Sequence, residues 1–190
     1  MSEIVLFHHV QGLTPGVEAF AERLRGAGHT VHVPDLFEGH TFDSIEEGFA
    51  HVKQTGFDEV RARADRAVEG LPAELVYAGL SLGVMEAQRL AQTRPGAGGA
   101  LLLHACVPPA EFGAWPAGLP AQVHGMDHDP FFADEGDLDA ARALAAEQGT
   151  VEVFTYPGDQ HLFSDSSLPA YDAEATGLMT QRILEFLERS

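Results

Sequence analysis

The fold of this chain is decided by residues 75–83, which read LVYAGLSLG. The first four residues are apolar or aromatic and predict a buried strand that runs into Gly79. Residues 84–93 follow with no intervening loop and predict a helix. The chain therefore passes directly from a strand into a helix, and Ser81 lies in the turn between Gly79 and Gly83.

Strands and helices alternate on both sides of this turn. We expect the other strands at residues 4–7, 30–33, 100–103, 121–124 and 151–156. We expect the other helices at residues 17–24, 58–69 and 138–148, and a last one that places Met179, Ile183, Phe186 and Leu187 on one face. Residues 37–57 predict a loop with a short helix beside a cleft. The alternation predicts one α/β domain over residues 1–190, a three-layer sandwich with a mainly parallel sheet and helices on both faces.

The composition is that of a globular domain. The chain has 190 residues, of which 45% are hydrophobic and 21% charged, and a chain of this length buries roughly 70% of its unfolded surface without disulfides or metals. Its single cysteine, Cys106, cannot form an internal disulfide, which favours a reducing, cytoplasmic location. A net charge of −18, from 11 basic and 29 acidic residues, disfavours nucleic acids and anionic membrane surfaces as partners. We expect no targeting segment, and the apolar stretches are shorter than the ~20 residues that span a bilayer.

The pattern Gly79-Leu80-Ser81-Leu82-Gly83 matches the G-x-S-x-G nucleophile elbow, in the strand-turn-helix context that this motif requires. A turn this tight holds the serine in a strained conformation, and the two glycines let strand and helix approach closely. We predict Ser81 as a nucleophile and the Leu82 N–H, at the helix N-terminus, as a donor to a developing oxyanion. The alternative is a glycine-rich turn whose serine takes no part in chemistry. Cys106 lacks such glycines and is expected to be a buried structural thiol.

A serine hydroxyl needs a general base, and the base needs an acid to orient it. Among the histidines after Ser81, His161 follows the last expected strand, so its ring can reach back over the carboxyl edge of the sheet. We predict His161 as the base, the alternative being a solvated loop histidine. The acid should follow the preceding strand, where we favour Asp127 over Asp129. Asp129 stays a competitor, although an aspartate before proline is also suited to capping a turn.

The second oxyanion donor should come from the loop after the first strand, where Gly12 permits an inward-facing amide. We predict the Gln11 N–H for this role, with the Val10 N–H as the alternative. Two segments hold residue types that bind metals: His8-His9, and the run containing His124, Asp127, His128 and Asp129. Neither has the spacing of a known zinc or two-metal site, so we expect no metal and no other cofactor.

Several segments of the chain resemble the dienelactone hydrolase family of α/β-hydrolases. They include the strand, loop and helix of residues 5–20, the elbow at Ser81, and Gly125-Met126-Asp127. The most specific are Val33-Pro34-Asp35-Leu36-Phe37 and the run from Tyr156-Pro157-Gly158 to His161-Leu162-Phe163. The resemblance implies an α/β-hydrolase fold and a hydrolase of small carboxylic esters or lactones that acts through a covalent acyl-enzyme without a cofactor.

Three departures from the family pattern concern the nucleophile and the substrate. The type enzymes have a cysteine nucleophile where this chain has Ser81, and a glutamate after the first strand where it has Val10 and Gln11. They also bind a substrate carboxylate through an arginine just beyond the histidine, where this chain has Ser164 and Asp165. We therefore expect neutral or cationic esters as substrates rather than an anionic dienelactone.

The same residues would serve a thioesterase, another acyl hydrolase or an acyl transferase, and a ligand-binding protein on a hydrolase scaffold is the alternative without catalysis. At 190 residues there is little room for a cap domain, so loops at residues 35–57 and 108–120 should cover the site. Four aromatic residues are available there as walls, the equal alternative being that they belong to the core: Phe37, Phe42, Phe112 and Trp115. The expected partner is a small ester or lactone, and the sequence leaves open whether the chain is a monomer or a homodimer.

Overall fold

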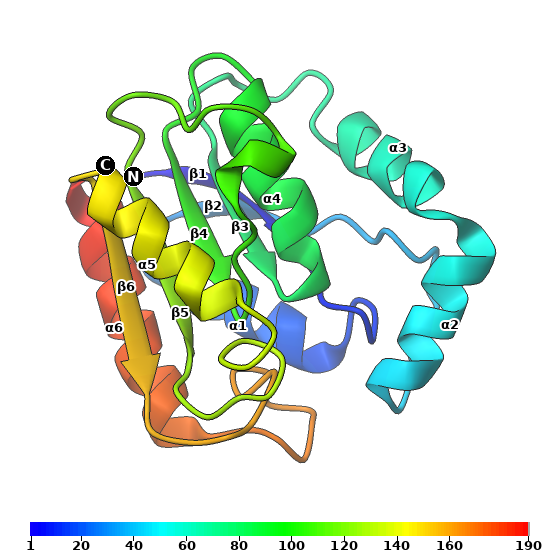
Figure 1. Cartoon of the computed structure of the whole chain (residues 1–190). Helices are drawn as coiled ribbons and strands as arrows, with labels where there is room; N and C mark the ends of the chain where they lie inside the picture. The colour runs from blue at the N-terminus through cyan, green and yellow to red at the C-terminus, as the bar shows by residue number, and fades with distance from the viewer. Residues whose placement is uncertain (190) are drawn as a thin grey trace.

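The computed structural model describes residues 1–189, and the strand-to-helix turn lies at its centre. Strand β3 (Val76–Leu80) ends just before Ser81, and helix α4 (Leu82–Thr93) begins just after it. Within the described residues β3 is third in a sheet of six strands, in the order β2-β1-β3-β4-β5-β6. Every neighbouring pair is parallel (Figure 1), so the predicted mainly parallel sheet is confirmed.

The other elements agree with the predicted ones to within a few residues. The remaining strands are β1 (Glu3–Phe7), β2 (Thr30–His32), β4 (Gly99–Leu103), β5 (Ala121–Met126) and β6 (Val151–Tyr156). The remaining α-helices are α1 (Pro15–Gly26), α2 (Ile45–Thr55), α3 (Phe57–Ala67), α5 (Asp137–Glu147) and α6 (Ala173–Arg189). A short 3-10 helix spans Pro109–Glu111 in the proline-rich connection before β5.

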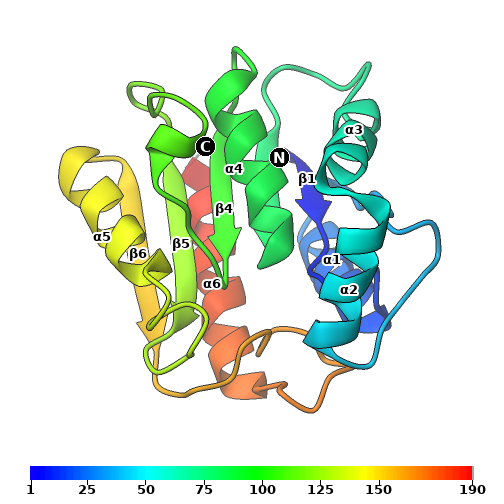
Figure 2. The same ribbon diagram turned by 45° about the vertical axis from the view of Figure 1, so that its right-hand side comes forward.

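Side chains alternate along the strands between two hydrophobic cores, because successive residues of a strand face opposite sides of a sheet. One core packs strand residues such as Val5, Tyr77 and Leu102 against α4 and α5. The other packs strand residues such as Ile4 and Leu101 against α1 and α6. Figures 1 and 2 show the same division, with α1 and α6 on one face of the sheet and α4 and α5 on the other. The predicted three-layer sandwich is therefore confirmed.

The region between β2 and β3 forms two helices, α2 and α3, which are separated by Gly56 at φ 91°. Helix α2 is the short helix that we expected within residues 37–57, and α3 agrees with the helix predicted at residues 58–69. The Ser44 side chain accepts the Glu47 N–H and caps the start of α2. In α2 the buried positions are Gly48 and Val52, so this helix contributes little to the hydrophobic core.

The parallel strands end at one edge of the sheet, and the loops there carry the polar residues that matter for function. His9, Ser81 and His104 follow β1, β3 and β4, while Asp129 and His161 follow β5 and β6. In open parallel sheets this edge is the usual place for a ligand site. Among residues 1–189, no helix is long and apolar enough to cross a membrane.

Candidate active site

Ser81 lies in a strained turn whose shape depends on its two flanking glycines. Its backbone has φ 51° and ψ −110°, a region that residues other than glycine rarely occupy. A Cβ atom at Gly79 would lie 2.3 Å from the Gly83 carbonyl oxygen, and one at Gly83 would lie 2.3 Å from the Phe7 carbonyl oxygen. The Ser81 N–H donates to the Leu103 carbonyl oxygen at 2.7 Å. Strand and helix therefore approach each other and β1 as closely as the predicted elbow requires.

His161 and Asp129 continue a hydrogen-bonded chain that starts at Ser81. Ser81 Oγ and His161 Nε2 are 2.7 Å apart, and His161 Nδ1 is 2.6 Å from Asp129 Oδ2. Asp129 is fully buried, and its other carboxylate oxygen accepts the Phe131 N–H at 2.9 Å. A carboxylate beside Nδ1 favours the tautomer with its proton on that nitrogen, which leaves Nε2 able to accept the serine proton. The structure thus brings together Ser81 and His161, the two residues that we predicted as nucleophile and base.

The carboxylate beside His161 belongs to Asp129, so our preference for Asp127 was wrong. Asp127 contacts the His128 ring at 2.6 Å and accepts the Gly158 N–H at 3.1 Å, and the His128 contact is the main cause of its lowered pKa. Strand β5 runs to Met126, two residues beyond the predicted end, and the Asp127 N–H still donates to the Tyr156 carbonyl oxygen at 2.9 Å. Asp127 therefore prolongs the pairing of β5 with β6, while Asp129 lies in the following turn and reaches His161.

Of the two backbone amides that we predicted as oxyanion donors, the Leu82 N–H is available and the Gln11 N–H is not. Leu82 is the first residue of α4, where a backbone N–H has no acceptor within the helix. The Gln11 N–H instead donates to His9 Nδ1 at 3.2 Å, which contradicts our choice of Gln11. The Val10 N–H makes no hydrogen bond within residues 1–189, so Val10, the alternative, supplies the free amide of this loop.

Ser81 and His161 line a cavity of about 290 Å³ that is apolar on one side and acidic on the other. Its large apolar side chains are Ile45, Phe49, Phe57, Met85 and Phe131. None of the four aromatic residues that we expected as walls lines it, and Phe37 and Trp115 belong to the hydrophobic core instead. Glu135 and Asp137 form the acidic side, and the lining residues include no Lys or Arg. The aromatic wall thus comes from α2, α3 and the loop after β5.

Helix α3, which supplies part of this wall, is tied to the loop after β2. Arg63 of α3 donates to the Leu36 carbonyl oxygen at 2.8 Å and forms ion pairs with Glu38 and Glu59. The contacts to Leu36 and Glu38 fasten α3 beside the cavity. The cavity residues Phe49 of α2 and Phe57 of α3 are 37% and 54% exposed.

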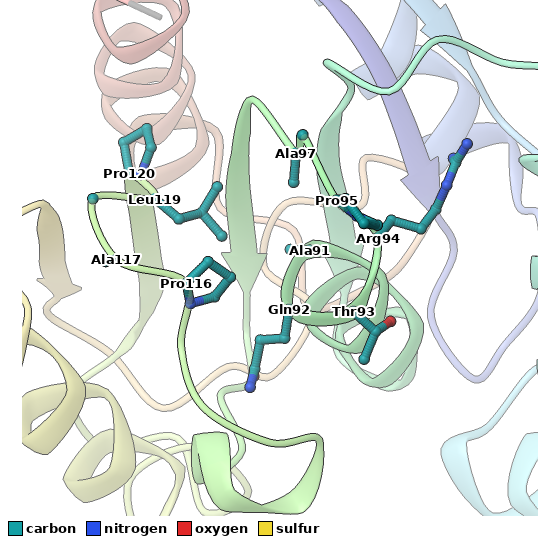
Figure 3. A pocket seen from close by; sticks show the side chains of 12 residues that line it. Ala91, Gln92, Thr93, Arg94, Pro95, Ala97, Pro116, Ala117, Leu119 and Pro120 are labelled. Atoms are coloured by element: carbon teal, nitrogen blue, oxygen red, sulfur yellow. The ribbon is translucent and has the colours of Figure 1, made fainter.

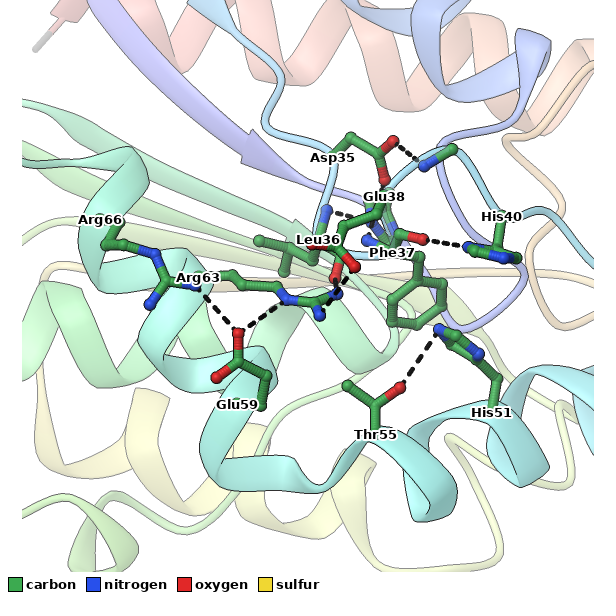
Figure 4. Close-up of polar contacts among 12 residues, drawn as sticks. Asp35, Leu36, Phe37, Glu38, His40, His51, Thr55, Glu59, Arg63 and Arg66 are labelled. Carbon is green, nitrogen blue, oxygen red and sulfur yellow. Dashed lines mark hydrogen bonds and ion pairs between the residues drawn. The ribbon is translucent and has the colours of Figure 1, made fainter.

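A larger cavity of about 430 Å³ lies at the opposite, amino-terminal edge of the sheet (Figure 3). It is formed by residues 91–97 and 116–120, which precede β4 and β5. Its charged side chain, Arg94, donates to the Tyr77 hydroxyl at 2.9 Å. Its lining residues include no histidine, cysteine or carboxylate, so it holds no counterpart of the hydrogen-bonded chain at Ser81. Figure 4 shows the polar contacts of α3 with the loop after β2: Arg63 pairs with Glu59 within α3 and reaches Glu38 in the loop.

Cys106, the other nucleophile in the sequence, is a buried thiol. Burial raises its pKa to about 12, so the sulfur carries its proton at neutral pH. Its backbone N–H donates to the Asp137 carboxylate at 3.0 Å. These observations agree with our interpretation of Cys106 as structural.

Sequence reasoning missed a buried polar network behind His161. Asp165 accepts hydrogen bonds from His9 Nε2 at 2.7 Å and from the Thr14 and Ser167 hydroxyls. Burial alone would raise the pKa of Asp165, but the hydrogen bonds from His9, Ser167 and Thr14 together lower it to about 2. The sequence holds no direct signal for this network, because His9 and Asp165 are 156 residues apart and each occurs in an irregular loop.

Asp165→Asn should lower the stability of the protein at neutral pH. The pKa of Asp165 is about 2 in the folded protein against an ordinary 3.8, so its ionised form stabilises the fold above about pH 4, and this stabilisation is lost as the pH falls towards 2. The shift corresponds to about 2 kcal/mol. Thermal melts at several pH values should therefore show a lower Tm for the variant at neutral pH and a shrinking difference in acid. The exposed Asp159, changed to Asn, is the control, and a Tm difference that persists undiminished at about pH 2 would contradict the prediction.

Comparison with solved structures identifies the fold. A dienelactone hydrolase-like promiscuous phosphotriesterase from metagenomic libraries has a TM-score of 0.74 at 19% identity, over 100% of this chain and 86% of that one. Esterase 2 of Thermogutta terrifontis, phosphonylated by cyclosarin, has a TM-score of 0.63 at 19% identity, over 99% and 82% of the two chains. The thioesterase domain from the curacin biosynthetic pathway has a TM-score of 0.64 at 15% identity, over 96% and 90%. At these identities the likeness is one of fold, and it confirms the predicted α/β-hydrolase architecture.

The family follows from the sequence match rather than from these structures. A search of curated proteins found no match. The model of the dienelactone hydrolase family, in contrast, matches residues 1–190. The chain, matched from end to end, belongs to the dienelactone hydrolase family.

Proposed function

We propose that this protein hydrolyses small carboxylic esters or lactones through Ser81, His161 and Asp129. The observation that carries the proposal is the hydrogen-bonded chain from Ser81 Oγ through His161 to Asp129, with distances of 2.7 Å and 2.6 Å, beside a cavity of about 290 Å³. Family membership supports hydrolysis as the type of reaction. What we propose beyond this is that the nucleophile is the Ser81 oxygen and that the substrate is an ester.

In the first half of the proposed reaction the enzyme is acylated. Ser81 Oγ attacks the carbonyl carbon of the ester while His161 Nε2 takes the hydroxyl proton. The carbonyl oxygen becomes an oxyanion, to which the Leu82 and Val10 N–H groups donate. His161 then gives its proton to the leaving alcohol oxygen as the carbon–oxygen bond breaks, and the acyl group stays on Ser81.

In the second half water replaces the alcohol. His161 takes a proton from the water, whose oxygen attacks the acyl carbon, and the bond to Ser81 Oγ breaks as His161 returns the proton to it. Asp129 stabilises the imidazolium that forms in both halves. It is suited to this task because it is fully buried and lies 2.6 Å from His161 Nδ1.

We propose further that the substrate carries no negative charge near its reacting carbonyl. Glu135 and Asp137 line the cavity, and none of the lining residues is a Lys or Arg. The net charge of −18 adds a long-range repulsion of anions. A cavity of about 290 Å³ is at the small end of ligand pockets, which favours a small neutral or cationic ester.

Glu135→Gln should narrow the preference for cationic over anionic esters. Glu135 is exposed, so water and salt screen its charge, and we expect the ratio of the two kcat/KM values to fall by about 3-fold at low ionic strength. The measurement uses two esters of similar size, one with a trimethylammonium group and one with a carboxylate. Glu147→Gln is the matched control, because Glu147 lines a different cavity and does not line the one at Ser81. A wild-type enzyme that prefers the anionic ester would contradict the proposed substrate class.

The reaction itself is tested with p-nitrophenyl esters of rising acyl length, run beside acyl thioesters of the same lengths. The proposal predicts ester turnover that is highest for a short acyl group. A higher kcat/KM for the thioesters would make thioester hydrolysis the main activity, and product partitioning on addition of alcohols or amines would reveal acyl transfer. Folded wild-type protein that turns over neither substrate would contradict the proposal and favour a ligand-binding role.

A further inference from the structure

We propose that His8 and His9 are positioning residues, which hold two consecutive peptide groups of the loop after β1 so that the Val10 N–H faces the oxyanion. The inference rests on the proposed ester hydrolysis at Ser81. It gives a role to the His8-His9 pair, which resembles metal ligands in the sequence but is engaged on all four ring nitrogens by protein atoms.

His8 holds the peptide group between His9 and Val10. Its Nδ1 lies 2.7 Å from the His9 carbonyl oxygen, and because a carbonyl can only accept, Nδ1 must be the donor. Its Nε2 accepts the Leu36 N–H at 3.0 Å, and burial lowers the pKa of the ring to about 4, so His8 is neutral. The Gly12 N–H donates to the same His9 carbonyl oxygen at 3.0 Å. In a trans peptide the N–H points opposite to the carbonyl, so these two donors set the direction of the Val10 N–H.

His9 holds the next peptide group, between Val10 and Gln11. Its Nδ1 accepts the Gln11 N–H at 3.2 Å, and its Nε2 donates to Asp165 Oδ2 at 2.7 Å. The carbonyl of the same peptide group packs on α2, where a Cβ atom at Gly48 would lie 2.1 Å from the Val10 oxygen. Contacts at both ends therefore prevent this peptide group from turning its N–H towards the substrate. The Val10 N–H is then the amide of this loop that can donate to the oxyanion.

The loop held in this way lies against the first turn of α4. A Cβ atom at Gly83 would lie 2.3 Å from the Phe7 carbonyl oxygen and 2.7 Å from that of His8. This approach places the segment that carries the Val10 N–H beside the segment that carries Ser81 and the Leu82 N–H. Neither histidine ring lines the cavity at Ser81, so both act through the backbone of the loop.

The two rings are oriented alike relative to the loop, and this makes the inference testable. In each, Nδ1 contacts the loop, whereas Nε2 contacts an anchor outside it, namely Leu36 for His8 and Asp165 for His9. An asparagine places its amide where Nδ1 was, and a glutamine places its amide where Nε2 was. His8→Asn and His9→Asn thus keep the loop contact, and His8→Gln and His9→Gln keep the anchor contact.

We expect the two glutamine variants to lose kcat by ~10- to 100-fold with KM changed by less than about 3-fold, because a misdirected oxyanion donor weakens transition-state binding more than ground-state binding. The asparagine variants should keep most of the wild-type kcat. At position 9 the Tm values should run in the opposite order, since the glutamine keeps the bond to the ionised Asp165 and the asparagine loses it. A purely structural role predicts instead that kcat follows Tm.

His124 provides the matched control. It is buried, its Nδ1 contacts the Tyr156 hydroxyl at 2.8 Å and its Nε2 contacts Gln122 Oε1 at 3.1 Å, but it lies within β5 and away from the loop. His124→Asn and His124→Gln should differ in Tm without the kcat order expected at positions 8 and 9. Equal kcat losses in the asparagine and glutamine variants at both positions, or kcat values that follow Tm, would overturn the inference.

Nitrogen NMR of the wild-type protein gives a readout that does not depend on turnover. The contacts require opposite neutral tautomers, with the proton of His8 on Nδ1 and the proton of His9 on Nε2. Finding the same tautomer in both rings would overturn the inference even if the protein hydrolyses esters. Failure of the proposed function would appear differently, as an absence of ester turnover and of phosphonate labelling at Ser81 in the wild type, and the positioning role would fall with it.

Discussion

Replacing Ser81 with alanine should lower kcat for ester hydrolysis by ~10⁴-fold or more. Ser81 Oγ lies 2.7 Å from His161 Nε2, and without this oxygen no acyl-enzyme can form. The fold should survive, because alanine removes a hydroxyl without adding volume and the backbone strain at φ 51° is already present in the wild type. The measurement is kcat on a p-nitrophenyl ester, with circular dichroism and Tm to show that the variant is folded.

Ser166→Ala is the control for this substitution. Ser166 lies in the loop that carries His161 and is exposed, so its loss should leave kcat within about 2-fold of the wild type. A folded Ser81→Ala protein with wild-type turnover would show that the nucleophile is another residue, and burial of the Cys106 thiol makes that cysteine a poor substitute.

Asp129→Asn should lower kcat by about 10³- to 10⁴-fold, the second-largest effect that we expect. The carboxylate lies 2.6 Å from His161 Nδ1 and is fully buried, so its charge stabilises the imidazolium with little screening by water. An asparagine of nearly the same shape keeps the packing but removes the charge, and it can present its NH₂ group to Nδ1, which favours the wrong tautomer. The loss should therefore be mostly in kcat, as measured by steady-state kinetics on the same ester.

Asp127→Asn separates the two candidates for the triad acid. Asp127 is partly exposed and contacts His128 and Gly158 rather than His161, so its substitution should change kcat by less than about 3-fold. If Asp127→Asn caused the large loss and Asp129→Asn did not, the assignment of Asp129 would be wrong.

The sequence was sufficient to predict that Ser81 and His161 lie together, because both follow strands with clear boundaries. Residues 75–80 are continuously apolar apart from Gly79, and the glycines around Ser81 allow the close approach of β3 and α4. His161 follows β6 and Pro157-Gly158, which end that strand unambiguously. The order of the strands then places both residues at the same edge of the sheet.

The errors arose where a contact between distant segments of the chain decides the outcome. The choice of Asp127 over Asp129 depended on where β5 ends, and β5 extends to Met126 because it pairs with β6 as far as Tyr156. The choice of Gln11 over Val10 depended on the ring of His9, whose orientation is set by Asp165. Local sequence preference carries no information on either contact.

The sequence left open, for a related reason, whether the aromatic residues near the site form its walls or belong to the core. Phe37 and Trp115 are in irregular segments next to the expected site, but both are drawn into the core that the sheet forms with α4 and α5. Phe49 and Phe57 occur on helices with few buried residues, and they remain exposed beside the cavity because they face away from that core. Which aromatic side chain is core and which is wall follows from packing that a single sequence does not reveal.

The most direct test of the central claim is to treat the wild type and Ser81→Ala with a fluorophosphonate and to map the adduct by mass spectrometry. A hydroxyl that has a histidine base 2.7 Å away, with its own carboxylate partner, should attack phosphorus rapidly and retain the adduct. We predict one adduct on the wild type, located at Ser81, and none on Ser81→Ala. An adduct at another residue, or no adduct on folded wild-type protein, would contradict the account.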